Sequence, residues 1–366
     1  MPASILSIGT AVPPHETKQS DLVKFMNNYL TKERSTSRKI QVLFNLSGIK
    51  KRFSVVPDFN QTHESFTFFP KSKDLEPFPS TQRRMEMYQD HALDLAEEAV
   101  KDCLKDGNDK ASAITHLITV SCTGMYAPGL DIELVERLGL STQTERTAIN
   151  FMGCYAAFNA LKVARGILDT NPESKVLLVA VELCSLHFQK STSDDALVSN
   201  TLFGDGAASL LLGKQNGGIG LSLESFHSDL ALQGKREMGW FIKDVGFEMK
   251  LTGEVPRIIQ DGIQALTNNL LRKMDLKISE IDFFAIHPGG RKILEVIEES
   301  LNISHTQNAP ARNILAAYGN MSSPTVIFTL KEIFEKLGPQ DSGKKILSFA
   351  FGPGLTLESM LLKINA

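Results

Sequence analysis

Three polar residues stand where an apolar run gives way to a tight turn and then to a helical pattern. Cys154 lies in "FMGCYA", His287 opens "HPGG", and Asn320 lies in "YGNMSS". A cysteine at a helix start is expected to have a lowered thiol pKa, because free backbone N–H groups and the helix dipole favour an anion. A thiolate can attack an acyl carbon, while imidazole and amide groups donate hydrogen bonds to the oxyanion or enolate that forms.

Each of the three residues also has a structural interpretation. A free cysteine is often a small buried hydrophobe, a histidine can cap a helix, and an asparagine after glycine is often a turn residue. Pro288 ends the apolar run before it because proline cannot donate to a β-ladder. Parallel sheets bring such strand ends to one edge, where α/β folds bind ligands, and three junctions of this kind favour the catalytic interpretation.

The surrounding pattern predicts an α/β chain. Short apolar runs predict buried strands, and apolar residues at helical spacing predict helices between them. The predicted strands cover 116–124, 175–185, 208–213, 282–290 and 344–354, and the predicted helices cover 153–170, 291–302 and 323–338. The glycine-rich "GKQNGGIG" near the middle predicts two strand-helix-strand halves, 1–217 and 218–366.

Composition excludes several classes of protein. The chain has 366 residues, 42% of them hydrophobic, and a net charge of -3, which provides no electrostatic footprint for nucleic acid. No apolar stretch approaches the ~20 residues of a membrane span, and the first residues lack signal-peptide features, so we expect no membrane partner and a cytoplasmic location. No metal site is expected, because none of the four cysteines forms the close pairs of zinc sites: Cys103, Cys122, Cys154 and Cys184.

The motifs resemble those of one family. "FMGCYAA", "FGDGAA", "HPGG", "YGNMSS" and "FGPGLTLE" occur in the order and spacing of type III polyketide synthases, the chalcone synthase-like branch of the thiolase superfamily, and the chain resembles a bacterial-type member. Related ketoacyl carrier-protein synthases usually show "HQAN" and "GNTS" instead. The resemblance covers essentially the whole chain. It implies a thiolase-like αβαβα fold, with the cysteine in the N-terminal half and the histidine and asparagine in the C-terminal half.

The same resemblance implies roles for the three residues. Cys154 matches the nucleophile that holds the starter and the growing chain as a thioester, and His287 and Asn320 match the pair that stabilises the enolate and oxyanion. The implied enzyme is an acyltransferase that extends an acyl starter with malonyl-CoA by decarboxylative Claisen condensation. It would release a pyrone or a resorcinol- or phloroglucinol-type product, need no cofactor, and form a homodimer. A single-condensation 3-ketoacyl synthase and an inactive thiolase-fold scaffold are the alternatives.

The expected substrate-binding residues depart from the plant pattern. Phe203 matches one gatekeeper phenylalanine, but Gly239 stands where the second would be, with Trp240 beside it as a replacement. We therefore expect aliphatic starters to be preferred to p-coumaroyl-CoA. Residues that match cavity-lining or loop positions could also serve only for packing or a tight turn: Cys122, Cys184, His187, Gly352, Pro353 and Gly354.

The expected CoA-binding cations are incomplete. Counting back from "IKKR" (49–52), Lys39 matches the first of three plant cations, whereas Val42 and Leu46 stand at the other two. Arg38, Lys50 or Arg52 could take over their role. Alternatively, the starter arrives on an acyl carrier protein. Where plant enzymes send a methionine into the partner's cavity, this chain has Ala127.

Overall fold

The structure is a computed structural model that describes residues 2–105 and 111–366. The elements of the first half are β1 (Ser4–Ala11), β2 (His15–Lys18), α1 (Gln19–Tyr29), α2 (Arg34–Leu46), β3 (Lys51–Ser54), α3 (Thr81–Leu104), β4 (His116–Ser121), α4 (Leu130–Leu138), β5 (Glu145–Asn150), α5 (Ala156–Thr170), β6 (Val176–Leu183), α6 (Asp194–Leu202) and β7 (Asp205–Gly213). Those of the second half are β8 (Gly220–Leu230), β9 (Met238–Lys243), β10 (Gly246–Leu251), α7 (Val255–Arg272), β11 (Phe283–Ile286), α8 (Arg291–Leu301), α9 (Ala309–Tyr318), α10 (Thr325–Phe334), β12 (Lys345–Gly352) and β13 (Thr356–Asn365).

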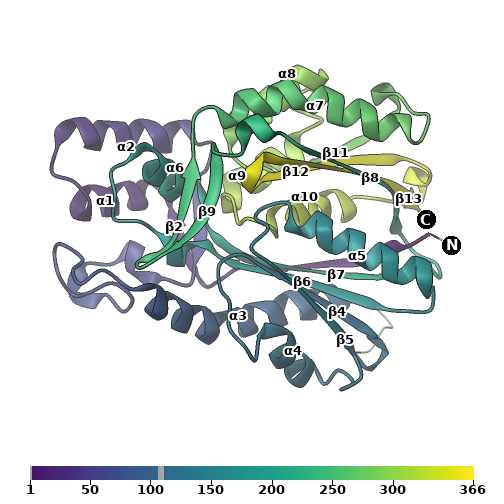
Figure 1. Ribbon diagram of the computed structural model, residues 1–366, viewed down its shortest axis with the longest axis horizontal. Helices are drawn as coiled ribbons and strands as arrows, with labels where there is room; N and C mark the ends of the chain where they lie inside the picture. Colours follow the sequence, from purple (N-terminus) through teal and green to yellow (C-terminus); the bar gives the residue numbers. More distant parts are fainter. Residues whose placement is uncertain (1, 106–110) are drawn as a thin grey trace.

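The main sheet is continuous through both halves of the chain. Among the described residues its strand order is β11-β12-β13-β8-β1-β7-β6-β4-β5, and the halves join where β1 pairs with β8. Helices α5 and α10 lie between the two half-sheets, α3 and α4 cover one outer face, and α7 and α8 cover the other (Figure 1). This is the αβαβα layering expected of a thiolase-like fold.

The central helices are apolar because a half-sheet lies against each side of them. Helix α10 buries every residue from Thr325 to Leu330, and α5 buries mainly alanines on the faces turned to the strands. Their side chains share one hydrophobic cluster with strands of both halves. Burial of this kind keeps the starts of α5 and α10 close to the sheet.

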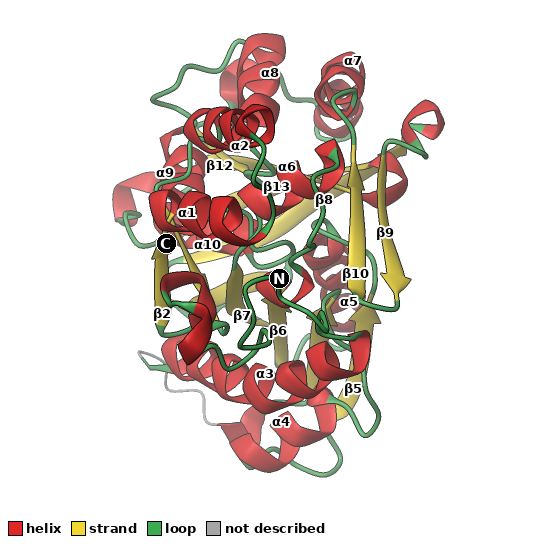
Figure 2. Ribbon diagram, turned by 90° about the vertical axis from the view of Figure 1, so that its left-hand side faces the viewer, coloured by secondary structure: helices red, strands yellow, loops and turns green. Residues whose placement is uncertain are grey.

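Every strand and helix predicted from apolar patterning is present, with ends that differ by a few residues. Neither Ser322 nor Ser323 is the N-cap of α10, although serine is a common residue there: Pro324 occupies that position, and the Ser323 hydroxyl donates to Glu182. The sequence also did not predict the β9–β10 ribbon. That ribbon stands outside the main sheet, as Figure 2 shows, and depends on contacts with distant residues rather than on periodicity.

Neither a membrane-spanning helix nor a cluster of metal-binding side chains occurs among the described residues. None of their helices combines the length and apolar character needed to cross a membrane. Within the same residues, no group of three or more histidine, cysteine, aspartate or glutamate side chains is arranged to hold a metal ion.

Candidate active site

The three junction residues meet in one cavity of about 1240 Å³, a volume that includes its open mouth. Cys154 lies just before α5, His287 directly follows β11, and Asn320 lies between α9 and α10. Their exposed fractions are 7%, 1% and 3%. Because the cysteine comes from one half and the other two residues from the second half, the site exists only when the halves are packed together.

A left-handed turn presents Cys154. Gly153 has φ +83°, and a Cβ at this position would lie 2.3 Å from Pro353, so only glycine fits without strain. The Gly153 N–H donates to the sulfur of Cys122 at 3.0 Å. The predicted turn before a helix start is therefore confirmed.

An isolated β-bridge between the two halves holds the backbone of Asn320. Its N–H donates to the Leu202 carbonyl at 2.9 Å, and its carbonyl accepts from the Gly204 N–H at 3.0 Å. Phe203, the expected gatekeeper, is the residue paired with Asn320 in this bridge. Phe203 and Asn320 are thus fixed relative to each other.

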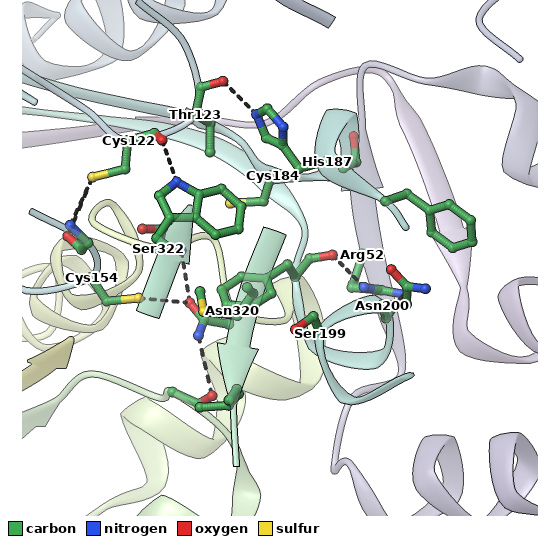
Figure 3. Close-up of a pocket in the computed structure, with 18 of the residues that line it drawn as sticks. Arg52, Cys122, Thr123, Cys154, Cys184, His187, Ser199, Asn200, Asn320 and Ser322 are labelled. Atoms are coloured by element: carbon green, nitrogen blue, oxygen red, sulfur yellow. Dashed lines mark hydrogen bonds between the residues drawn. The ribbon is translucent and has the colours of Figure 1, made fainter. Parts of the chain in front are cut away.

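Hydrogen bonds also fix the orientation of the Asn320 side chain. Oδ1 accepts from the Ser322 N–H at 2.8 Å, and Nδ2 donates to the Gly289 carbonyl at 3.3 Å. The Cys154 sulfur lies 4.0 Å from Oδ1, and Figure 3 shows it pointing at this amide. The amide nitrogen therefore faces the loop that follows His287.

Burial controls the charges of the catalytic pair. It raises the pKa of Cys154 to about 12 and lowers the pKa of His287 to about 3. Among the described residues, neither ring nitrogen of His287 has a hydrogen-bond partner. The expected lowered thiol pKa is therefore wrong for the substrate-free site, because loss of hydration outweighs the helix start. In the neutral ring, one nitrogen is therefore free to take a proton, and the N–H of the other is free to donate to a substrate oxygen.

Glu182 in β6 is a site residue that the sequence interpretation missed. It is fully buried and accepts hydrogen bonds from the Cys122 N–H at 2.9 Å, the Thr123 hydroxyl at 2.8 Å and the Ser323 hydroxyl at 2.7 Å. It thereby ties the end of β4 to the segment that carries Asn320. Its signal in the sequence is a lone charge inside the apolar run "KVLLVAVELCS".

Most of the residues expected in the cavity wall lie there. Phe203, Trp240, Cys122, Cys184, His187 and Pro353 line the cavity. Gly352 and Gly354 are not among its lining residues. A Cβ at Gly352 would lie 2.5 Å from the ring of Tyr155, and Gly354 has φ +77°, so both glycines serve close packing and a turn.

Trp240 and His187 anchor the β9–β10 ribbon over the cavity. The Trp240 indole N–H donates to the Cys122 carbonyl at 2.8 Å. His187 lies 2.7 Å from the Thr123 carbonyl through Nε2, and its Nδ1 accepts from the Phe247 N–H at 2.9 Å. Burial lowers the pKa of His187 to about 3, so it is a neutral anchor rather than a proton carrier.

The three expected CoA-binding cations are not equivalent. Lys39 and Lys50 are exposed, and Lys39 pairs with Asp194 of α6. Arg52 is only 5% exposed and donates to the carbonyls of Asn200 and Phe203 at the end of α6. A buried guanidinium held in this way does not support the expected phosphate contact of Arg52, because it is bound to the helix end instead.

Comparison with known proteins identifies the same family in both halves of the chain. The family model described as "Chalcone and stilbene synthases, N-terminal domain" matches residues 1–216, and the corresponding C-terminal model matches residues 225–365. The Mycobacterium tuberculosis protein "Alpha-pyrone synthesis polyketide synthase-like Pks18" is 36% identical over 293 residues, which are 78% of this chain and 74% of that protein.

Two further relatives cover nearly all of this chain. The crystal structure of PKS-I from the brown alga Ectocarpus siliculosus superimposes with a TM-score of 0.92 at 28% identity, covering 99% of this chain and 98% of that one. "Probable polyketide synthase 1" of Dictyostelium discoideum is 32% identical over 98% of this chain, which spans only 11% of that protein. The family models and the shared fold around Cys154, His287 and Asn320 show that this chain belongs to the chalcone and stilbene synthase family, the type III polyketide synthases.

Proposed function

We propose that the protein loads an aliphatic acyl starter on Cys154, extends it with malonyl units, and cyclises the chain to a pyrone or a resorcinol- or phloroglucinol-type product. The observation that carries this proposal is the convergence of Cys154, His287 and Asn320 in one largely apolar cavity. In the loading step the sulfur attacks the starter thioester, and His287 takes the thiol proton and passes it to the leaving thiol.

Extension depends on stabilising an enolate. When the malonyl carboxylate leaves as CO₂, its electron pair forms the enolate of the thioester, so no metal or organic cofactor is needed for this step. The Asn320 amide and a protonated nitrogen of His287 are the donors that face the cavity. Donors aimed at a developing oxyanion in a site that excludes water are among the largest contributions to catalysis.

The apolar character of the cavity supports an aliphatic starter. Leu22, Phe59, Phe188 and Ala196 line the cavity, and the phenylalanines belong to a larger aromatic cluster. Two serine hydroxyls of the wall, those of Ser54 and Ser185, bond to each other at 2.7 Å, whereas the buried Ser199 hydroxyl has no partner among the described residues. An alkyl chain gains most from packing against the leucine, phenylalanine and alanine side chains of this wall.

Product analysis tests the proposal. Purified protein would be incubated with malonyl-CoA and starters from acetyl to long-chain acyl-CoA and p-coumaroyl-CoA, and mass spectrometry would count the malonyl units. We expect at least two extensions of aliphatic starters. Ala196→Phe should abolish use of long starters while acetyl-CoA remains a substrate, which serves as the internal control. A chalcone as the main product, or a single extension with every starter, would contradict the proposal.

A homodimer is the proposed assembly. Strand β5 is the edge of the sheet, and most of its residues are exposed. Met125 and Ile132, on the segments beside this edge, are 40% and 43% exposed. An unpaired edge with apolar neighbours favours pairing with a second copy. Sedimentation of the protein and of Thr147→Pro, which removes a donor from β5, would test this.

The cytoplasmic location stays a prediction.

A further inference from the structure

Helix α2 exposes two large apolar side chains among cations. Val42 and Leu46 are 48% and 60% exposed, and their spacing of four residues puts them on one face of the helix. Arg38 lies one turn before Val42, and Lys50 follows the helix. Helix α2 contains no acidic residue. In the described part of the chain, no ion pair involves Arg38 or Lys50. We refer to Arg38, Val42, Leu46 and Lys50 as the α2 face.

Helix α2, which carries the α2 face, contacts elements at the wall of the cavity. Lys39 of α2 pairs with Asp194 of α6, and α6 lines the cavity through Ser199 and Asn200. The other end of α2 approaches α8: a Cβ at Gly48 would lie 3.5 Å from Arg291, which follows the cavity-lining "HPGG" turn. Both ribbon views place α2 at the end of the molecule opposite to β5, so the proposed dimer edge leaves this face open (Figures 1 and 2).

The chemistry of the face fits a protein better than a nucleotide. Phosphate groups need cations or N–H donors, and Val42 and Leu46 supply neither in the middle of the face. Protein interfaces combine an apolar centre with charges around it, and complementary charge steers the encounter. The surrounding cations match an acidic partner.

We propose that an acidic acyl carrier protein docks on the α2 face and delivers the starter on its phosphopantetheine arm. This inference rests on the proposed function, because it supplies the acyl group for Cys154. In the transfer, the Cys154 sulfur forms a bond to the acyl carbon, and the bond from that carbon to the pantetheine sulfur breaks. The thiol proton of Cys154 moves through His287 to the departing pantetheine sulfur, so the step is balanced and needs no other reactant.

The test compares two donors of the same acyl group. Decanoyl-CoA and an acidic bacterial acyl carrier protein loaded with decanoate would be mixed with the full chain, and intact-mass measurements would follow acylation of Cys154. We expect kcat/KM to be at least about tenfold higher with the carrier protein and to fall as salt rises. Leu46→Asp and Val42→Asp should lower loading from the carrier about tenfold or more, while loading from CoA stays within about twofold.

A matched control variant and a vesicle-binding assay separate docking of a carrier protein from the alternative explanations. Val163→Asp, at a 37% exposed position on α5, should leave both donors unchanged. Equal use of the two donors, or equal losses for both donors in Leu46→Asp, would overturn the docking proposal. Binding of α2 to anionic vesicles, with carrier loading unaffected by Leu46→Asp, would also overturn it and indicate a membrane surface instead. Failure of both donors to acylate Cys154 would contradict the proposed function itself.

Discussion

Replacing Glu182 should destabilise the protein and impair decarboxylation together. Three donors point at this buried carboxylate, from Cys122, Thr123 and Ser323. The Thr123 hydroxyl also accepts from the Leu183 N–H at 2.9 Å, so its own proton must go to Glu182. Glu182 therefore acts as an acceptor through both oxygens, and no other group in this network can replace it.

The magnitude follows from this count of donors. Leaving a buried donor unpaired costs about 1–3 kcal/mol, and Glu182→Ala leaves three donors unpaired; part of this cost is offset because the carboxylate no longer has to be buried. We expect Glu182→Ala to lower the free energy of unfolding by about 3–5 kcal/mol. Glu182→Gln keeps one oxygen for two donors and should cost only about 1–2 kcal/mol.

Urea unfolding of the two variants and malonyl-CoA decarboxylation would be measured side by side. Glu173→Ala is the matched control, because Glu173 is exposed and pairs with Lys214 at the surface; it should change stability by less than about 0.5 kcal/mol. Decarboxylation should fall in the Glu182 variants, because Ser323 lies three residues from Asn320. A loss below about 1 kcal/mol in Glu182→Ala would refute the argument from unpaired donors.

Three further predictions concern the catalytic residues and acid stability. Asn320→Ala should lower malonyl-CoA decarboxylation by about 10²–10³ while loading of Cys154 falls much less; equal losses would indicate a structural role. Because burial raises the pKa of Cys154, its labelling by iodoacetamide should accelerate from pH 6 to pH 9, and a constant rate over this range would show that His287 holds a thiolate. Burial alone would raise the pKa of Asp102, but hydrogen bonds from Lys331 and Lys105 hold this pKa at about 2. A lowered pKa stabilises the fold above the unfolded value near 4, and this contribution is lost as pH falls toward 2. Lys331→Met should therefore reduce the free energy of unfolding by about 1–2 kcal/mol at pH 7 but not at pH 2, and equal reductions would contradict this.

Local signals were sufficient to find the three polar residues that meet in the cavity and the class of fold. Glycine and proline interrupt the apolar runs at "FMGCYA", "HPGG" and "YGNMSS", and each interruption depends only on neighbouring residues. The strands and central helices were predictable for the same reason, since their apolar spacing is a property of short segments. The αβαβα layering and the family resemblance followed from these motifs in order.

The protonation states and the partners of the buried polar groups were decided only by the tertiary structure. Glu182 and Ser323 are 141 residues apart, and Arg52 lies 151 residues from the Phe203 carbonyl that it binds. The pKa of Cys154 rises because residues from both halves exclude water from it, which no pattern near residue 154 reveals. The sequence around a residue predicts whether that residue lies at the end of a strand. Its pKa and its hydrogen bonds, however, depend on every group that packs around it, and those groups come together only in the folded protein.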